Sequence, residues 1–141
     1  MQITLNHYCH KKGNNYWHFE WCPKYRYKMM RKLENKKIVE AAIRKAAFEH
    51  KIIIHYIAVM PDHIHALATL PHGMTDSDAF QILKGRSAYI IFRVKEKFRL
   101  RYPQGHFWSP GGFAVTVGYN DLNSLIQYIL NQAAHHGVAE A

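Results

Sequence analysis

Two apolar segments that meet at Pro61 place the strongest limit on how this chain can fold. Residues 51–60 are rich in branched apolar side chains, which predicts a buried strand. Residues 62–70 alternate in side-chain character, which predicts a second strand. Proline cannot donate a hydrogen bond to a sheet, so the break between the strands falls at Pro61. The sequence therefore predicts two consecutive strands and a fold built around a sheet.

His63 and His65 stand two positions apart in the second predicted strand. Alternate residues of a strand share a face, so both imidazoles are expected to project from the same side of the sheet. Their Cα atoms would be roughly 6.5–7 Å apart, a spacing from which two rings can converge on one cation. The pattern also fits a polar pair on a solvent-exposed face, and the spacing alone does not separate these alternatives.

The other periodic segments complete an order of strand, helix, two strands, helix, strand and helix. Strands are predicted at residues 15–21, 51–60, 62–70 and 113–117, and helices at 33–50, 78–98 and 120–136. This order matches the split β-α-β-β-α-β arrangement of ferredoxin-like and RRM-like folds, followed by one more helix. We therefore predict an α+β fold with an antiparallel sheet, helices on one face and a C-terminal helix. A single domain is expected over residues 1–141, with a polar arm at residues 1–13.

The chain is strongly basic, with 19 Lys and Arg against 10 Asp and Glu among 141 residues. This excess favours nucleic acid over a membrane as the partner, because no segment resembles a basic amphipathic anchor or a membrane span. A cytosolic protein is expected, because the N-terminus lacks a signal-peptide pattern. Cys9 and Cys22 fit no standard zinc spacing and are expected to be reduced thiols.

Two segments carry the cations that suit contacts to phosphates. The candidates are Lys24, Arg26, Lys84 and Arg86. The first two alternate with tyrosines in residues 24–28, which suits phosphate contacts with base stacking but also an exposed edge strand. The other two belong to the most basic helix, 78–98, where the alternative is an ordinary solvated face.

Tyr128 lies away from the apolar stripe of the last predicted helix. That stripe consists of Leu122, Leu125, Ile126, Ile129, Leu130 and Ala133. At 100° per residue, Tyr128 falls about 130° from the centre of the stripe, and Gln132 follows one turn later on the same flank. Tyr128 is therefore either an ordinary surface tyrosine or the partner of another chain, a nucleic acid or a metal site.

Metal-assisted phosphoryl transfer with a tyrosine nucleophile is suggested by four features taken together. These are the two strand histidines, the tyrosine and glutamine one turn apart, the basic helix and the lack of a nucleotide-binding loop. The chain also carries a series of longer motifs. These are Trp21-Cys22-Pro23-Lys24-Tyr25-Arg26, Val59-Met60-Pro61-Asp62-His63-Ile64-His65, Leu83-Lys84-Gly85-Arg86-Ser87-Ala88, Phe107-Trp108-Ser109-Pro110, Phe113-Ala114-Val115-Thr116-Val117-Gly118 and Gln127-Tyr128-Ile129-Leu130-Asn131-Gln132. In their order and spacing the chain closely resembles the single-tyrosine HUH transposases of the insertion-sequence 200/605 family. Gly111-Gly112 departs from that pattern, in which many relatives have a bulkier residue.

The resemblance implies that Tyr128 is the nucleophile and that Mg²⁺ or Mn²⁺ is bound by His63, His65 and Gln132. It implies cleavage and rejoining of single-stranded DNA with hairpins at element ends, through a 5′-phosphotyrosine and without a nucleotide cofactor. It also implies work on DNA in a prokaryotic cytoplasm, by a homodimer in which one chain's tyrosine helix can complete the other's metal site.

Two other functions remain compatible with the sequence. A domesticated nuclease acting on chromosomal repeat hairpins would use the same chemistry. A non-catalytic single-strand or RNA-binding module would instead stack bases on its aromatic side chains, with Tyr16, Trp17, Tyr25 and Tyr27 as candidates.

Overall fold

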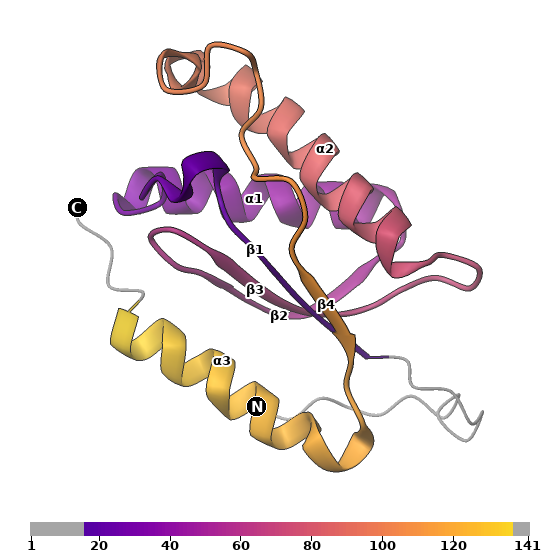
Figure 1. The fold of residues 1–141 in the computed structure, drawn as a ribbon. Coiled ribbons are helices and arrows are strands. Elements are labelled where there is room, and N and C mark those ends of the chain that lie inside the picture. The colour runs from indigo at the N-terminus through magenta and orange to yellow at the C-terminus, as the bar shows by residue number, and fades with distance from the viewer. Residues whose placement is uncertain (1–15, 137–141) are drawn as a thin grey trace.

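The computed structural model describes residues 16–136, except for the side chains of Tyr119, His135 and His136. The strands are β1 (Trp17–Trp21), β2 (Ile53–Val59), β3 (Ile64–Thr69) and β4 (Phe113–Thr116). The helices are α1 (Leu33–Glu49), α2 (Asp76–Val94) and α3 (Leu122–His136). Short 3-10 segments lie at Lys24–Arg26, Glu96–Leu100 and Tyr119–Asp121. The predicted order of strands and helices is confirmed, whereas the predicted arm at residues 1–13 and Cys9 lie outside the described residues (Figure 1).

The four strands form one antiparallel sheet in the order β2-β3-β1-β4. This order confirms the split β-α-β-β-α-β arrangement, because β1 and β3 are the two central strands. Glu20 of β1 lies directly opposite His65 of β3, and Trp21 lies opposite Ile64. The register of these two strands therefore sets which side chains meet at the centre of each face.

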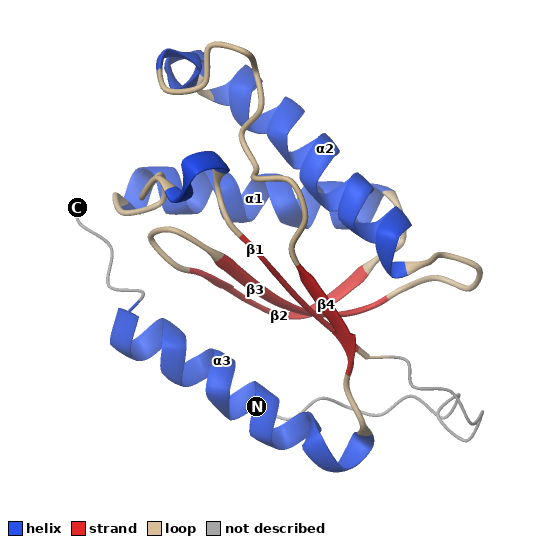
Figure 2. Ribbon diagram, in the orientation of Figure 1, coloured by secondary structure: helices blue, strands red, loops and turns tan. Residues whose placement is uncertain are grey.

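Helices α1 and α2 cover one face of the sheet, as expected (Figure 2). The apolar residues of α1 recur every three or four positions, so one side of the helix is buried while its cations remain in solvent. The buried core between these helices and the sheet includes Phe19, Trp21, Val39, Ile43, Ile64, Ala66, Leu83 and Ile91. This larger core fixes the orientation of β1 and β3.

Helix α3 packs against the opposite face of the sheet (Figure 1). Its buried residues Leu122, Ile126 and Ile129 share a second core with the other face of the strands. The strand and loop residues of that second core are Tyr16, Tyr56, Ala58, Met60, Leu67 and Val117. Since alternate residues of a strand point to opposite faces, His18, Glu20 and His65 share the α3 side with this core.

Several local predictions differ from the structure. Helix α2 begins at Asp76 rather than residue 78, because Thr75 caps it and forms a reciprocal capping box with Asp78. It ends at Val94, and the chain continues as a 3-10 segment that buries Phe98. Residues 24–28 do not form the edge strand considered as an alternative. They begin with a 3-10 turn in which Tyr25 and Arg26 have left-handed backbone angles, φ 62° and 52°.

His63 also differs from the prediction, because it precedes β3 instead of belonging to it, and this difference bears on function. The amide of Met60 donates to the carbonyl of His63 at 2.8 Å, closing a tight turn around Pro61 and Asp62. The predicted break at Pro61 is therefore correct. The turn is longer than expected, because it includes His63, which was predicted to lie in the second strand.

Gly112 allows β4 to start close against β1. Its φ of +149° and its position leave no room for a side chain, because a Cβ would lie 2.8 Å from the carbonyl oxygen of Glu20. The glycine pair that departs from the family pattern thus shapes the loop beside Glu20. None of the described helices is long and apolar enough to cross a membrane.

Candidate active site

The α3 face of the sheet carries a cluster of polar residues at the end where β1 finishes and β3 begins. The imidazole rings of His63 and His65 have their centroids 4.9 Å apart, so the turn still brings them together. Glu20 lies opposite His65, with its Oε1 atom 3.8 Å from Nε2 of His65. His18 stacks beside His65 with ring centroids 5.4 Å apart. The cluster therefore unites two strands and the turn between β2 and β3.

Each histidine of the HxH pair uses its Nδ1 atom to contact another protein side chain. Nδ1 of His63 lies 2.7 Å from Oδ1 of Asp62, and Nδ1 of His65 lies 3.1 Å from Nε2 of His18. These contacts hold both rings and leave the Nε2 atoms for a ligand. The donor and acceptor in the His18–His65 pair depend on the tautomers.

Burial keeps the central imidazoles neutral. Burial first, and then the nearby His63 and His18, lower the pKa of His65 to about 4. Burial also lowers the pKa of His18, against an opposing effect of the Glu20 carboxylate. Both residues are therefore neutral near neutral pH, and neutral imidazole is the form that binds a metal.

Asp62 connects the histidine pair to Arg26. Its Oδ2 atom accepts a hydrogen bond from Nε of Arg26 at 3.2 Å while Oδ1 contacts His63. Burial alone would raise the pKa of Asp62, but the hydrogen bond with His63 and the Arg26 charge outweigh it, so the pKa is lowered. Asp62 is therefore ionised and can orient the imidazole of His63.

Tyr128 approaches this cluster from α3. Its ring meets that of His65 edge to face, with centroids 5.6 Å apart, and the side chain is 47% exposed. The predicted position away from the buried stripe is correct, and the partner of Tyr128 in this chain is a histidine of the HxH pair. Gln132 follows one helical turn later and is partly buried. Leu130, predicted to belong to the apolar stripe, is 41% exposed.

His18, Glu20 and His65 have ligand atoms that all lie within 4.8 Å of one another, so this group could hold a metal ion. A carboxylate and neutral imidazoles are suitable ligands for Mn²⁺, and the carboxylate suits Mg²⁺. The free Nε2 atom of His65 and the Glu20 carboxylate thus fit the metal that the sequence implies.

The sequence interpretation missed His18 and Glu20. Their alternation with apolar residues could have indicated them. Both belong to the predicted strand 15–21, on the face opposite Phe19 and Trp21. The predicted topology pairs that strand with the one carrying His65. These two facts together would have directed attention to Glu20.

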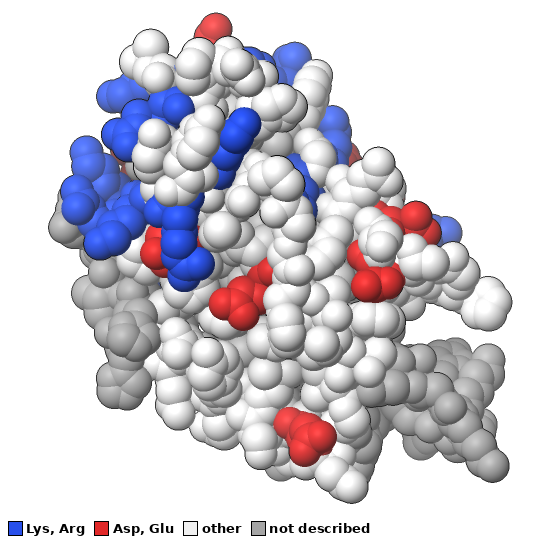
Figure 3. All heavy atoms as spheres, viewed as in Figure 1, with Lys and Arg blue, Asp and Glu red and all other residues white. Residues whose placement is uncertain are grey.

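Lys and Arg side chains gather over the helix layer, whereas α3 contains neither (Figure 3). Of the four cations predicted to contact DNA, Lys24 and Lys84 line one pocket beside α2. The other two are engaged in ion pairs. Arg26 is paired with Asp62, and Nε of Arg86 contacts Oε1 of Glu49 at 2.9 Å. The four residues therefore do not form one uniform basic surface.

The family model described as transposase IS200-like matches residues 11–132. The ISDra2 transposase TnpA of Deinococcus radiodurans is 28% identical over 127 residues, covering 86% of this chain and 90% of that protein. The transposase of insertion sequence IS200 from Salmonella typhimurium is 28% identical over 131 residues, covering 93% and 85%.

Solved structures share the fold. A Deinococcus radiodurans R1 protein assigned as a transposase superposes with a TM-score of 0.67 at 25% identity, covering 89% of this chain and 92% of that one. A REP-associated tyrosine transposase bound to a REP hairpin gives a TM-score of 0.60 at 20% identity, covering 96% and 74%. The match of the family model over most of the chain, on a fold shared with these structures, shows that the chain belongs to the IS200-like transposase family.

Proposed function

We propose that this transposase cleaves and rejoins single-stranded DNA through a covalent 5′-phosphotyrosine formed on Tyr128. The observation that carries the proposal is the contact between Tyr128 and His65, because it joins the predicted nucleophile to the histidine cluster. The matched family supports the same chemistry, since a transposase must break and join DNA strands.

Tyr128 would attack the scissile phosphate in line. Its phenol oxygen forms a new bond to phosphorus, losing its proton, while the bond to the 3′ oxygen breaks and that oxygen takes up a proton. One phosphodiester replaces another, so a free 3′-hydroxyl can later reverse the exchange without a nucleotide cofactor. The exposure of Tyr128 supports this role, because a nucleophile has to meet a large substrate.

His63 and His65, whose ring centroids lie 4.9 Å apart, would hold Mg²⁺ or Mn²⁺ together with Gln132 of the tyrosine helix. Glu20 is a further candidate ligand, because its carboxylate clusters with His65 and His18. The bound ion would polarise the phosphate oxygens and offset the charge that develops in the transition state. Asp62 and His18 would orient the two imidazoles through their Nδ1 atoms, so that the Nε2 atoms can face the metal.

Hairpins at the ends of the element are the proposed substrate, and a homodimer is the proposed assembly. The REP hairpin bound to a protein of the same fold makes hairpin DNA the first ligand to test. In this chain α3 packs on its own sheet, so the described contacts support a site completed within one chain. A dimer that exchanges its tyrosine helices would use the same residues from two chains.

The observed side chains count against a purely stacking module. Tyr16 is buried, and Trp17 and Tyr27 pack against the larger core, so of the four candidate stacking residues Tyr25 alone is largely exposed, at 67%. Such a module would use an open sheet face, which here is covered by α3.

The test is formation of a covalent protein–DNA adduct. The protein is incubated with Mg²⁺ and single-stranded DNA that spans a hairpin-bearing element end, and denaturing electrophoresis separates the adduct. The proposal predicts an adduct that requires the metal and is absent from Tyr128→Phe. His63→Ala and His65→Ala should also lose cleavage while retaining hairpin binding. An adduct of normal yield in Tyr128→Phe would refute the assignment of the nucleophile.

A further inference from the structure

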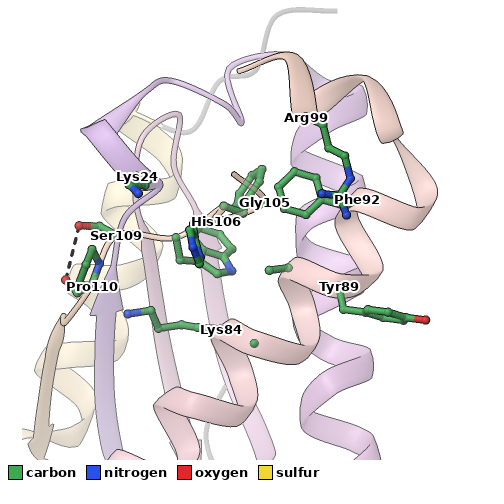
Figure 4. Close-up of a pocket in the computed structure, with 13 residues that line it drawn as sticks. Lys24, Lys84, Tyr89, Phe92, Arg99, Gly105, His106, Ser109 and Pro110 are labelled. Atoms are coloured by element: carbon green, nitrogen blue, oxygen red, sulfur yellow. Dashed lines mark hydrogen bonds between the residues drawn. The ribbon is translucent and has the colours of Figure 1, made fainter. Parts of the chain in front are cut away.

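A pocket of about 590 Å³ opens on the α2 side of the sheet, away from Tyr128. It lies between the middle of α2, the 3-10 turn that begins at Lys24 and the loop of residues 105–110 (Figure 4). Its volume is within the usual range for a small-ligand site. None of the residues proposed to carry out the reaction at Tyr128 lines this pocket.

The pocket is lined by cations that lack acidic partners. Among residues 16–136, no carboxylate forms an ion pair with Lys24, Lys84 or Arg99, in contrast to Arg26 and Arg86. Nζ of Lys84 instead donates to the carbonyl of Gly111 at 2.6 Å. The charges at the pocket are thus balanced by no neighbouring acid of the described chain, which favours an anionic ligand.

Lys24 is held in place by backbone contacts. Its amide donates to the carbonyl of Phe107 at 2.8 Å, and its carbonyl accepts from the hydroxyl of Tyr102 at 2.9 Å. The amide of Ser109 donates to the carbonyl of Cys22, so two segments run side by side here. This arrangement fixes the start of the Lys24 side chain before any ligand binds.

The rest of the pocket is aromatic and apolar. Its lining includes Phe92, whose ring lies 4.6 Å below the guanidinium of Arg99, and Trp108, whose indole donates to Oγ of Ser87 at 2.9 Å. His106 is exposed and lies in the centre of the pocket, whereas the side chain of Tyr89 points away from it (Figure 4). An exposed aromatic ring, that of His106, beside cations without acidic partners is a combination that can bind a base together with its phosphate.

The pocket also lies near the same end of the sheet as the histidine cluster. The last residue of β1, Trp21, is opposite Ile64, which follows His63. Three residues beyond Trp21 the chain reaches Lys24 of the pocket, and Arg26 then contacts Asp62. One short turn therefore connects the pocket lining to the residue that orients His63.

We propose that this pocket takes one nucleotide of the single-stranded DNA that flanks the scissile phosphate. The phosphate lies against Lys24 and Lys84, and the base stacks on the ring of His106. The inference rests on the proposed function, because the strand that enters the pocket is the one that Tyr128 cleaves.

The phosphate half is tested by salt-dependent binding. Every protein carries Tyr128→Phe, and the probe is a fluorescent single-stranded oligonucleotide of about 16 nucleotides, the upper end of a usual site size. Lys24→Gln with Lys84→Gln should lower the slope of log affinity against log salt by about 0.7 to 1.4, equivalent to one or two phosphate contacts. The matched control removes the exposed Lys37 and Lys45 of α1. Equal slope changes in both pairs, or none in the pocket pair, would overturn the proposal.

The base half is tested by abasic substitution. An abasic site moved along the same oligonucleotide should weaken binding by about 5-fold or more at one position, the lower end for aromatic stacking on a base. That loss should disappear in His106→Ala, a change at an exposed residue. If an abasic site weakens binding of His106→Ala as much as it weakens binding of the protein with His106, at the same positions of the oligonucleotide, the pocket does not take the base. A competing deoxynucleoside monophosphate that displaces the oligonucleotide at equal concentration would show a free-nucleotide site and refute the proposal.

The pocket and the proposed function can fail separately. With Tyr128 intact, the Lys24→Gln and Lys84→Gln pair should need a higher DNA concentration than the unmodified protein for half-maximal adduct formation. Normal adduct formation with unchanged single-strand binding in that pair would refute the pocket alone. Pocket-dependent binding without any adduct in the unmodified protein would refute the proposed chemistry alone.

Discussion

Replacing Asp62 tests how the histidine pair is prepared for a metal ion. Asp62 contacts Nδ1 of His63 at 2.7 Å and is kept ionised partly by Arg26. Removing a residue that orients a metal-binding histidine typically lowers metal affinity about 10- to 100-fold. Since every tenfold is about 1.4 kcal/mol, Asp62→Ala should weaken Mn²⁺ binding by about 1.4 to 2.7 kcal/mol.

Asp62→Asn separates orientation from charge. An amide oxygen can still accept a hydrogen bond from His63, but a neutral bond is about half as strong as a charge-assisted one. The expected loss is therefore about half of the Ala value, or about 3- to 10-fold in affinity. If Asp62 acted only through its negative charge, the Asn and Ala variants would lose the same amount.

The assay is a titration of the DNA-free protein with Mn²⁺, followed by electron paramagnetic resonance or calorimetry. Glu49→Ala is the matched control, because Glu49 also pairs with an arginine but lies at the end of α1. Its affinity for Mn²⁺ should equal that of the unmodified protein. Unchanged affinity in Asp62→Ala, or an equal loss in Glu49→Ala, would refute the reasoning.

Three further predictions concern the ligand set and the packing. Glu20→Gln should lower Mn²⁺ affinity at least tenfold, about 1.4 kcal/mol, and unchanged affinity in the same titration would exclude its carboxylate as a ligand. Ile126→Ala should lower the free energy of unfolding by about 2–5 kcal/mol in urea, whereas Leu130→Ala, at a residue 41% exposed, should change it by about 0.5 kcal/mol or less. Burial lowers the pKa of His55, so the unfolded state binds more protons and stability should fall as pH drops through about 6.5. His55→Gln should flatten that pH dependence of the urea midpoint, and an unchanged slope would contradict the burial argument.

The topology could be predicted because each segment carries its own periodicity. Pro61 marked the break between β2 and β3, and the spacing of apolar residues in 33–50 marked α1. The off-stripe position of Tyr128 also followed from helix geometry alone. The side of the sheet that α3 covers did not follow, because its apolar stripe would fit either face.

The complete site depended on contacts between segments far apart in sequence. Glu20 faces His65 only through the register of β1 and β3, and His18 contacts the same ring from the next position on that face. Arg86 was chosen for its charge, but Glu49, 37 residues away, occupies its guanidinium. The left-handed backbone at Tyr25 could not be predicted from the sequence either, since glycine is the residue that usually adopts that conformation.

The most direct test of the central claim is to identify the tyrosine that carries DNA. The covalent adduct formed with single-stranded DNA and Mg²⁺ is digested with protease and nuclease, and mass spectrometry locates the nucleotide remnant. The chain contains nine tyrosines, so the DNA could be found on a tyrosine other than Tyr128. The account predicts a phosphodiester link on Tyr128 through the 5′ end of the DNA. A remnant on any other residue, or a link through the 3′ end, would contradict it.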